Sequence, residues 1–84
     1  MDAETKLRQI MEVLDQLADD TSVPRNIRRG AAEAKERLTH KEEALDLRSA
    51  SAVMILDELA NDPNIPLHGR TLIWNIISQL ETVK

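Results

Sequence analysis

The residues best suited to chemistry in this chain are arginines gathered in one segment. Residues 25–41 carry six basic side chains against two acidic ones, a net charge of +4, whereas the rest of the chain sums to −8. The segment uses mainly arginine, whose planar guanidinium makes bidentate contacts with phosphate or carboxylate groups. No aromatic residue lies among the arginines, which excludes base stacking of the kind that holds single-stranded nucleic acid. The four arginines are Arg25, Arg28, Arg29 and Arg37.

Three interpretations of this basic segment remain open. The acidic segments that flank it could neutralise it within the fold, as an ordinary charge-paired face. It could instead be an exposed surface for a protein partner, or a surface that contacts RNA in a ribonucleoprotein. The overall net charge of −4 weighs against a dedicated DNA-binding or membrane-binding protein.

Aspartates provide the second candidate chemistry. Two pairs are separated by 42 residues, Asp15 with Asp57 and Asp20 with Asp62. A repeated carboxylate can act as a general acid and base in a hydrolase, but we favour a structural role. Asp20 and Asp62 precede helices opened by proline, where a carboxylate can accept hydrogen bonds from loop N–H groups. Asp15 and Asp57 lie near helix C-termini, where Arg28 and Arg70 are the expected cationic partners.

The two histidines have acidic or amide neighbours in the sequence, His40 with Glu42, Glu43 and Asp46, and His68 with Asp62 and Asn64. Neither segment has two histidines at the i, i+4 spacing that makes a helical metal site specific. The chain has no cysteine, its two glycines are isolated, and its hydroxyl residues form no nucleophile motif. We therefore predict no catalytic residue, no metal and no cofactor, and we expect that the protein is not an enzyme.

Four helical segments must position these residues. Gly and Pro total five residues, there is a single aromatic residue, and 42% of the chain is hydrophobic, a composition typical of helical proteins. Apolar residues recur at helical spacing over residues 3–19, 24–38, 44–60 and 66–83. Pro24 and Pro66 open the second and fourth helices, because proline is tolerated in a first helical turn.

An internal repeat orders the four helices into two hairpins. Residues 14–38 align without a gap on residues 56–80, so that Val23-Pro24 falls on Ile65-Pro66. We predict an all-α, up-and-down four-helix bundle in a single domain, residues 1–84, with hairpins at about 3–39 and 44–83. The alternative is a two-repeat solenoid fragment similar to the HEAT class, but solenoids need at least about three repeats to be stable.

The fourth helix is apolar over most of its circumference, and we expect it to be the most deeply buried. Its Trp74 is the single aromatic residue of the chain and is predicted to pack in the core. An exposed Trp74 would instead be an interface anchor, because tryptophan is enriched in binding hot spots.

Two loop-plus-helix stretches resemble a family of small archaeal proteins of uncharacterised function. The first is Val23-Pro24-Arg25-Asn26-Ile27-Arg28-Arg29, and the second runs from Leu56-Asp57-Glu58-Leu59 through Asn61-Asp62-Pro63-Asn64 to Arg70-Thr71-Leu72-Ile73-Trp74. The resemblance spans nearly the whole chain and implies four helices and an archaeal cytoplasm, without any reaction, cofactor or partner. No uncharged run approaches the roughly 18 residues of a membrane span, so we expect a cytoplasmic protein that does not enter the membrane.

From these patterns we expect a non-catalytic protein-interaction or assembly module that binds an unknown protein partner or a second copy of itself. Because Pro24 and Pro66 are equivalent in the repeat, the two helix starts could form one composite surface. The first alternative is a ribonucleoprotein-associated or RNA-associated factor that uses the basic helix. A small hydrolase is the less favoured alternative. The candidate partner-binding residues are Arg25, Asn26, Arg28, Arg29, His68 and Arg70.

Overall fold

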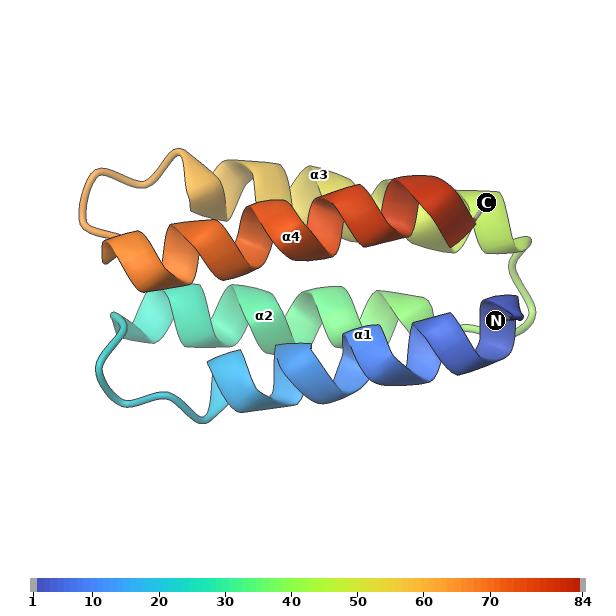
Figure 1. Cartoon of the computed structure of the whole chain (residues 1–84), viewed down its shortest axis with the longest axis horizontal. Helices are drawn as coiled ribbons and strands as arrows, with labels where there is room; N and C mark the ends of the chain where they lie inside the picture. Colours follow the sequence, from blue (N-terminus) through green and yellow to red (C-terminus); the bar gives the residue numbers. More distant parts are fainter. Residues whose placement is uncertain (1, 84) are drawn as a thin grey trace.

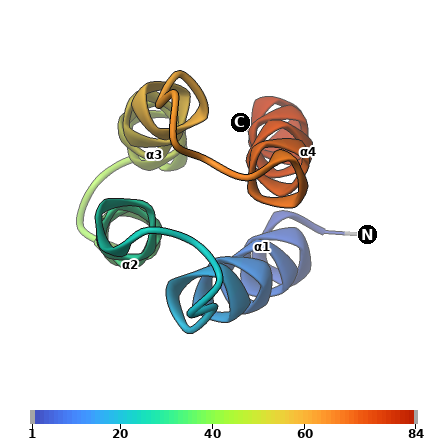
Figure 2. The same ribbon diagram turned by 90° about the vertical axis from the view of Figure 1, so that its left-hand side faces the viewer.

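Four antiparallel helices make up the bundle in the computed structural model, which describes residues 2–83. They are α1 (Ala3–Ala18), α2 (Arg25–Leu38), α3 (Leu45–Ala60) and α4 (Leu67–Val83). Each helix packs against the next one, and α4 packs back against α1, while the diagonal pairs are not in backbone contact (Figures 1 and 2). This closed arrangement confirms the predicted four-helix bundle, because an open solenoid fragment would leave α1 and α4 apart.

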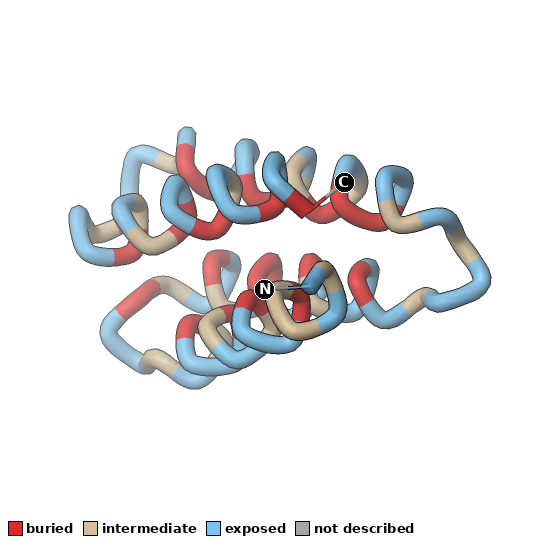
Figure 3. The backbone as a smooth tube through the Cα atoms, turned by 45° about the vertical axis from the view of Figure 1, so that its right-hand side comes forward, coloured by how far each residue is buried: buried red, intermediate tan, exposed pale blue. Residues whose placement is uncertain are grey.

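The buried residues of each helix lie along the side that faces the other helices (Figure 3), and nearly all of them are apolar, as expected for amphipathic helices. In α1 these are Leu7, Ile10, Leu14 and Leu17. In α2 the buried side chains are smaller, because three of the five buried residues are alanine or glycine. A Cβ added at Gly30 would lie 2.6 Å from Leu59 Cδ2, so glycine allows α2 and α3 to approach each other closely.

The three connections between the helices share one backbone turn. Their turns are closed by the amides of Val23, Glu43 and Ile65, which donate to carbonyl oxygens three residues earlier at 3.2, 3.0 and 3.2 Å. In the first and third connections an aspartate stabilises the turn. Asp20 Oδ1 accepts from the Ser22 amide at 2.9 Å, and Asp62 Oδ1 accepts from the Asn64 amide at 2.8 Å. These bonds confirm the structural role predicted for Asp20 and Asp62.

The prediction that α4 is the most deeply buried helix is wrong. Trp74 is 56% exposed and Leu67 is 75% exposed, although the sequence suggested a core position for the tryptophan. Ile73 and Ile76 fill the core-facing side of α4. Trp74 follows Ile73 directly and is therefore rotated by about 100° around the helix, away from the core. No helix within residues 2–83 is long and apolar enough to cross a membrane.

Candidate functional site

The up-and-down topology brings the α1–α2 and α3–α4 connections to one end of the bundle, at the left of Figure 1. We call this end the double-loop end. The starts of α2 and α4 both lie there, as the equivalence of Pro24 and Pro66 suggested. All six candidate partner-binding residues therefore belong to the first five residues of two helices at the same end. The α2–α3 connection lies at the opposite end, together with the start of α1 and the end of α4.

Two reciprocal contacts hold the two hairpins together at the double-loop end. Asn26 Nδ2, from the start of α2, donates to Asp62 Oδ2 in the α3–α4 connection at 2.6 Å. His68 Nε2, from the start of α4, lies 3.2 Å from Asp20 Oδ2 in the α1–α2 connection. We call these two contacts the clasp. Asn26 and His68 thus have partners within the chain, and the sequence neighbourhood of His68 did not show which carboxylate it meets.

Asp20 is the best-supported carboxylate of the clasp. The Ser22 hydroxyl donates to Asp20 Oδ1 at 2.6 Å, in addition to the Ser22 amide. The hydrogen bonds from the Ser22 hydroxyl and amide, followed by the contact with His68, hold the pKa of Asp20 below its ordinary value. These interactions stabilise the ionised carboxylate, which suits a structural role better than proton transfer at neutral pH.

A serine, a histidine and an aspartate meet here, but not in the order of a catalytic triad. The Ser22 hydroxyl oxygen lies 3.3 Å from His68 Nε2, the same ring nitrogen that faces Asp20. In a nucleophilic triad the carboxylate and the hydroxyl occupy opposite ring nitrogens, so that the histidine takes the hydroxyl proton while the acid orients it. The arrangement gives no reason to assign Ser22 as a nucleophile.

Arg70 binds carbonyl oxygens and not the carboxylate expected for it. Its Nε donates to the Ala60 carbonyl at 3.1 Å and its Nη2 lies 3.4 Å from the Asp62 carbonyl oxygen. Arg70 lies in the first turn of α4, beside the last residue of α3, so the carbonyls at the end of α3 are close to its guanidinium. A cation at a helix C-terminus interacts favourably with the helix dipole.

Arg48 has the same role at the opposite end of the bundle, and the sequence patterns did not reveal it. It is the fourth residue of α3, as Arg70 is of α4, and it donates from Nη1 to the Leu38 carbonyl at 3.1 Å. The side chain is buried and its Nε has no acceptor among the described residues. The signal available in the sequence was the recurrence of arginine at the fourth position of α2, α3 and α4.

The expected pairing of Arg28 with Asp15 is also wrong. Asp15 forms an ion pair with Lys35, whose Nζ lies 2.8 Å from Oδ1 and 2.9 Å from Oδ2. Arg28 is half-buried at the fourth position of α2, and its Nε has no acceptor within the described chain. Lys35 lies seven residues beyond Arg28, about 10 Å further along α2, so Asp15 meets the later part of α2 and not its first turn.

The remaining arginines of α2 are exposed, and no carboxylate within residues 2–83 forms an ion pair with Arg25, Arg28, Arg29 or Arg37. Neutralisation of the basic helix by its neighbours is therefore limited to Lys35. The first turn of α2 contains no acidic residue, and Pro24 makes no side-chain cap. Arg25 lies three and four residues from Arg28 and Arg29, so like charges adjoin one another at the positive end of the helix dipole.

Exposed apolar side chains form a second feature of the surface. Besides Leu67 and Trp74 on α4, α3 exposes Leu47 and Met54, the latter at 69%. Met54 borders an open groove of about 380 Å³ between α2 and α3. The groove is lined by Glu33, Arg37, Ser51, Met54, Ile55 and Glu58.

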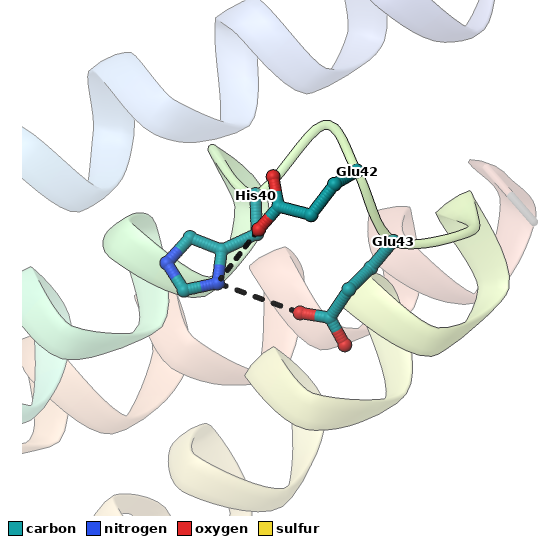
Figure 4. A group of neighbouring side chains, drawn as sticks. All are labelled: His40, Glu42 and Glu43. Carbon is teal, nitrogen blue, oxygen red and sulfur yellow. Dashed lines mark ion pairs between the residues drawn. The ribbon is translucent and has the colours of Figure 1, made fainter.

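A histidine with acidic neighbours lies at the far end of the bundle, in the α2–α3 connection (Figure 4). His40 Nδ1 lies 3.4 Å from Glu43 Oε1 and 3.8 Å from Glu42 Oε1. Asp46, also expected near His40, instead accepts a hydrogen bond from the Leu47 amide at 3.0 Å. His40, Glu42 and Glu43 are the group within residues 2–83 whose ligand atoms converge closely enough for a metal ion, all within 4.8 Å of one another.

Comparison with known proteins places the chain among archaeal relatives. The sequence profile of the family described as "Uncharacterised protein family (UPF0147)" matches residues 1–83. The chain is 52% identical to a UPF0147 protein of Methanosarcina acetivorans over 98% of this chain and 84% of the relative. It is 49% identical to a UPF0147 protein of Pyrococcus abyssi over 99% of this chain and 98% of that one. The crystal structure of a UPF0147 protein from Thermoplasma acidophilum superposes with a TM-score of 0.93 at 44% identity, covering 96% of this chain and 95% of that one.

Proposed function

The chain belongs to the uncharacterised protein family UPF0147, and from its geometry we propose that it is a protein-interaction or assembly module that binds its partner through the double-loop end. The observation that carries the proposal is the group of arginines at the start of α2. Arg25 and Arg29 are exposed and form no ion pair with any described carboxylate. They also lie near Arg28, at the positive end of the helix dipole.

This distribution of charge is unfavourable for the isolated chain. Like charges three and four residues apart destabilise a helix, and cations near its N-terminus do so as well. An anionic partner would offset both effects, and guanidinium groups recognise carboxylates through paired hydrogen bonds. We therefore propose an acidic protein surface as the partner of Arg25 and Arg29, with Arg28 adding to the positive field from its half-buried position.

The roles of the six candidate residues differ within this proposal. Asn26 and His68 hold the two connections together, and Arg70 binds the end of α3, so these three residues shape the surface. Arg25 and Arg29 are the groups free to contact a partner. The groove beside Met54 and the exposed Trp74 lie on other parts of the surface and supply apolar area that an assembly could cover.

A capture experiment tests the proposal with a control of equal charge. The protein serves as bait in a lysate of Methanosarcina acetivorans, the organism of a relative that is 52% identical to this chain, with and without nuclease. It is compared with the double variants Arg25→Ala/Arg29→Ala and Arg8→Ala/Arg37→Ala, which each remove two exposed arginines that form no ion pair with a carboxylate among residues 2–83. We expect a nuclease-resistant protein partner that is lost from the first variant and kept by the second.

Two outcomes would contradict the proposal. Equal loss in both double variants would mean that net charge alone governs the association. Partners that disappear on nuclease treatment, with an affinity that falls steeply with salt, would favour the ribonucleoprotein alternative.

A further inference from the structure

We propose that His40, Glu42 and Glu43, in the connection between α2 and α3, form a binding site for a divalent transition-metal ion. The site lies at the end of the bundle opposite the double-loop end, so the inference is independent of the proposed partner surface. Figure 4 shows the imidazole of His40 with the carboxylates of Glu42 and Glu43 turned toward the same ring nitrogen.

The donor set is the first argument. One imidazole nitrogen and two carboxylate oxygens are a ligand combination suited to divalent transition metals such as zinc. The histidine distinguishes this group from an ordinary patch of surface acids, because a nitrogen donor faces both carboxylates at once. Lys41 lies between His40 and Glu42 in the sequence, yet it forms no ion pair with either glutamate within the described structure.

The distances are the second argument. Two ligand atoms that share a metal ion at about 2.1 Å lie about 3 to 3.6 Å apart. The separation of 3.4 Å between His40 Nδ1 and Glu43 Oε1 is within this range. The separation of 3.8 Å to Glu42 Oε1 exceeds it slightly, and a small rotation of the exposed Glu42 side chain would close the gap. Water completes the coordination shell, since the site is open on its outer side.

The opposite ring nitrogen supplies the third argument. His40 Nε2 lies 4.0 Å from Glu36 Oε1, in the last turns of α2. A metal-binding histidine usually donates its other N–H to a carboxylate or carbonyl, which fixes the tautomer and the ring orientation. Glu36 Oε1 is beyond hydrogen-bond distance of Nε2, and a small movement of its exposed side chain would let it accept a hydrogen bond from Nε2–H once Nδ1 binds the ion. The ring would then be held between an acceptor on α2 and the ligands of the connection.

The second histidine of the chain provides an internal control. His68 Nε2 meets the single carboxylate of Asp20, which is already bonded to Ser22. His68 is exposed at the start of α4, but no second carboxylate ligand converges on it within residues 2–83. A metal ion that merely prefers any surface histidine would not distinguish His40 from His68.

Titration with Zn²⁺ tests the inference on the full chain without a histidine tag, by isothermal calorimetry at neutral pH. We expect saturable binding of one ion per chain. His40→Ala and Glu43→Gln should abolish it, Glu36→Gln should weaken it about 10-fold, and His68→Ala should leave it unchanged. Circular dichroism before each titration verifies that the variants, all altered at the surface, retain the helical fold.

Three results would overturn the inference. No saturable binding up to millimolar Zn²⁺ would exclude the site, and so would binding by His40→Ala at the wild-type affinity. Equal weakening by His40→Ala and His68→Ala would show nonspecific binding to histidine.

Discussion

At the double-loop end Arg25 and Arg29 are exposed, together with Asp19, whereas the opposite end carries the exposed Glu42 and the half-buried Glu43 around His40. Both ends nevertheless use the same structural device, an arginine at the fourth position of a helix that binds the carbonyl ending the previous helix. Arg70 does so at the first end and Arg48 at the second. The comparison separates residues that hold the connections from residues that remain free for a ligand.

The largest effect on stability is expected from Arg48 and Arg70, which bind the last carbonyl of the preceding helix. Arg48→Ala removes a buried side chain and its bond to Leu38, so we expect a loss of about 2 to 3 kcal/mol in the free energy of unfolding. Arg70 is only half-buried, and Arg70→Ala should cost about 1 to 2 kcal/mol. Urea denaturation followed by circular dichroism measures both values. A loss at Arg70 that exceeds the loss at Arg48 would contradict the comparison.

The next largest loss of stability is expected from removal of the clasp. The double variant Asn26→Ala/His68→Ala removes both contacts between the hairpins at the double-loop end and should cost about 1 kcal/mol. His40→Ala, at the opposite end, should change stability by less than about 0.5 kcal/mol in the absence of metal. The same urea experiment compares the two, and equal losses would show that the clasp does not join the hairpins.

Acid should weaken both ends through aspartates whose pKa is lowered. Asp20 is held by Ser22 and His68, and Asp2 by the hydrogen bonds from Thr5 at the start of α1. A lowered carboxyl pKa contributes stability that is present above the ordinary value of 3.8 and is lost as the pH falls through the lowered pKa. Urea midpoints between pH 5 and pH 2 should therefore fall less steeply in Asp20→Asn and Asp2→Asn than in the wild type.

The smallest effect on stability is expected from the residues assigned to partner binding. Arg25→Ala/Arg29→Ala removes like charges at the positive end of α2, so the free energy of unfolding should rise by about 0.3 kcal/mol. The matched variant Arg8→Ala/Arg37→Ala should not show this rise in the free energy of unfolding, because neither arginine lies at the start of α2. A thermal melt that shows a marked loss in the first variant would mean that these arginines support the fold, and would remove the basis for the partner surface.

Much of the fold could be predicted because its signals are local. The spacing of Leu7, Ile10 and Leu14 indicates a helix by itself, and Pro24 and Pro66 mark the starts of two others. The equivalence of the two proline-opened helices also placed the candidate surface residues near the corresponding starts of α2 and α4. The resemblance to an archaeal family of uncharacterised function was confirmed by the match over residues 1–83.

The partners of individual side chains could not be predicted in the same way. Arg70 and Asp57, or Arg28 and Asp15, look complementary in sequence, yet the guanidinium of Arg70 binds carbonyls at a helix end and Asp15 binds Lys35. Which partner a charged side chain binds depends on its position along the helix axis relative to the residues of the neighbouring helix. The contacts of Asn26 with Asp62 and of His68 with Asp20 join different hairpins, and no local pattern specifies them.

The sequence by itself determined the helices, their approximate ends and the segment that carries the positive charge, since these follow from periodicity, proline and composition. Only the tertiary structure decided that Trp74 is exposed and Arg48 is buried. The reason is geometric. Each helix of the bundle can turn only one side toward the core, and α4 has more apolar residues than fit on that side. Which side chains are left outside, and therefore available to a partner or an ion, depends on how the four core-facing sides meet.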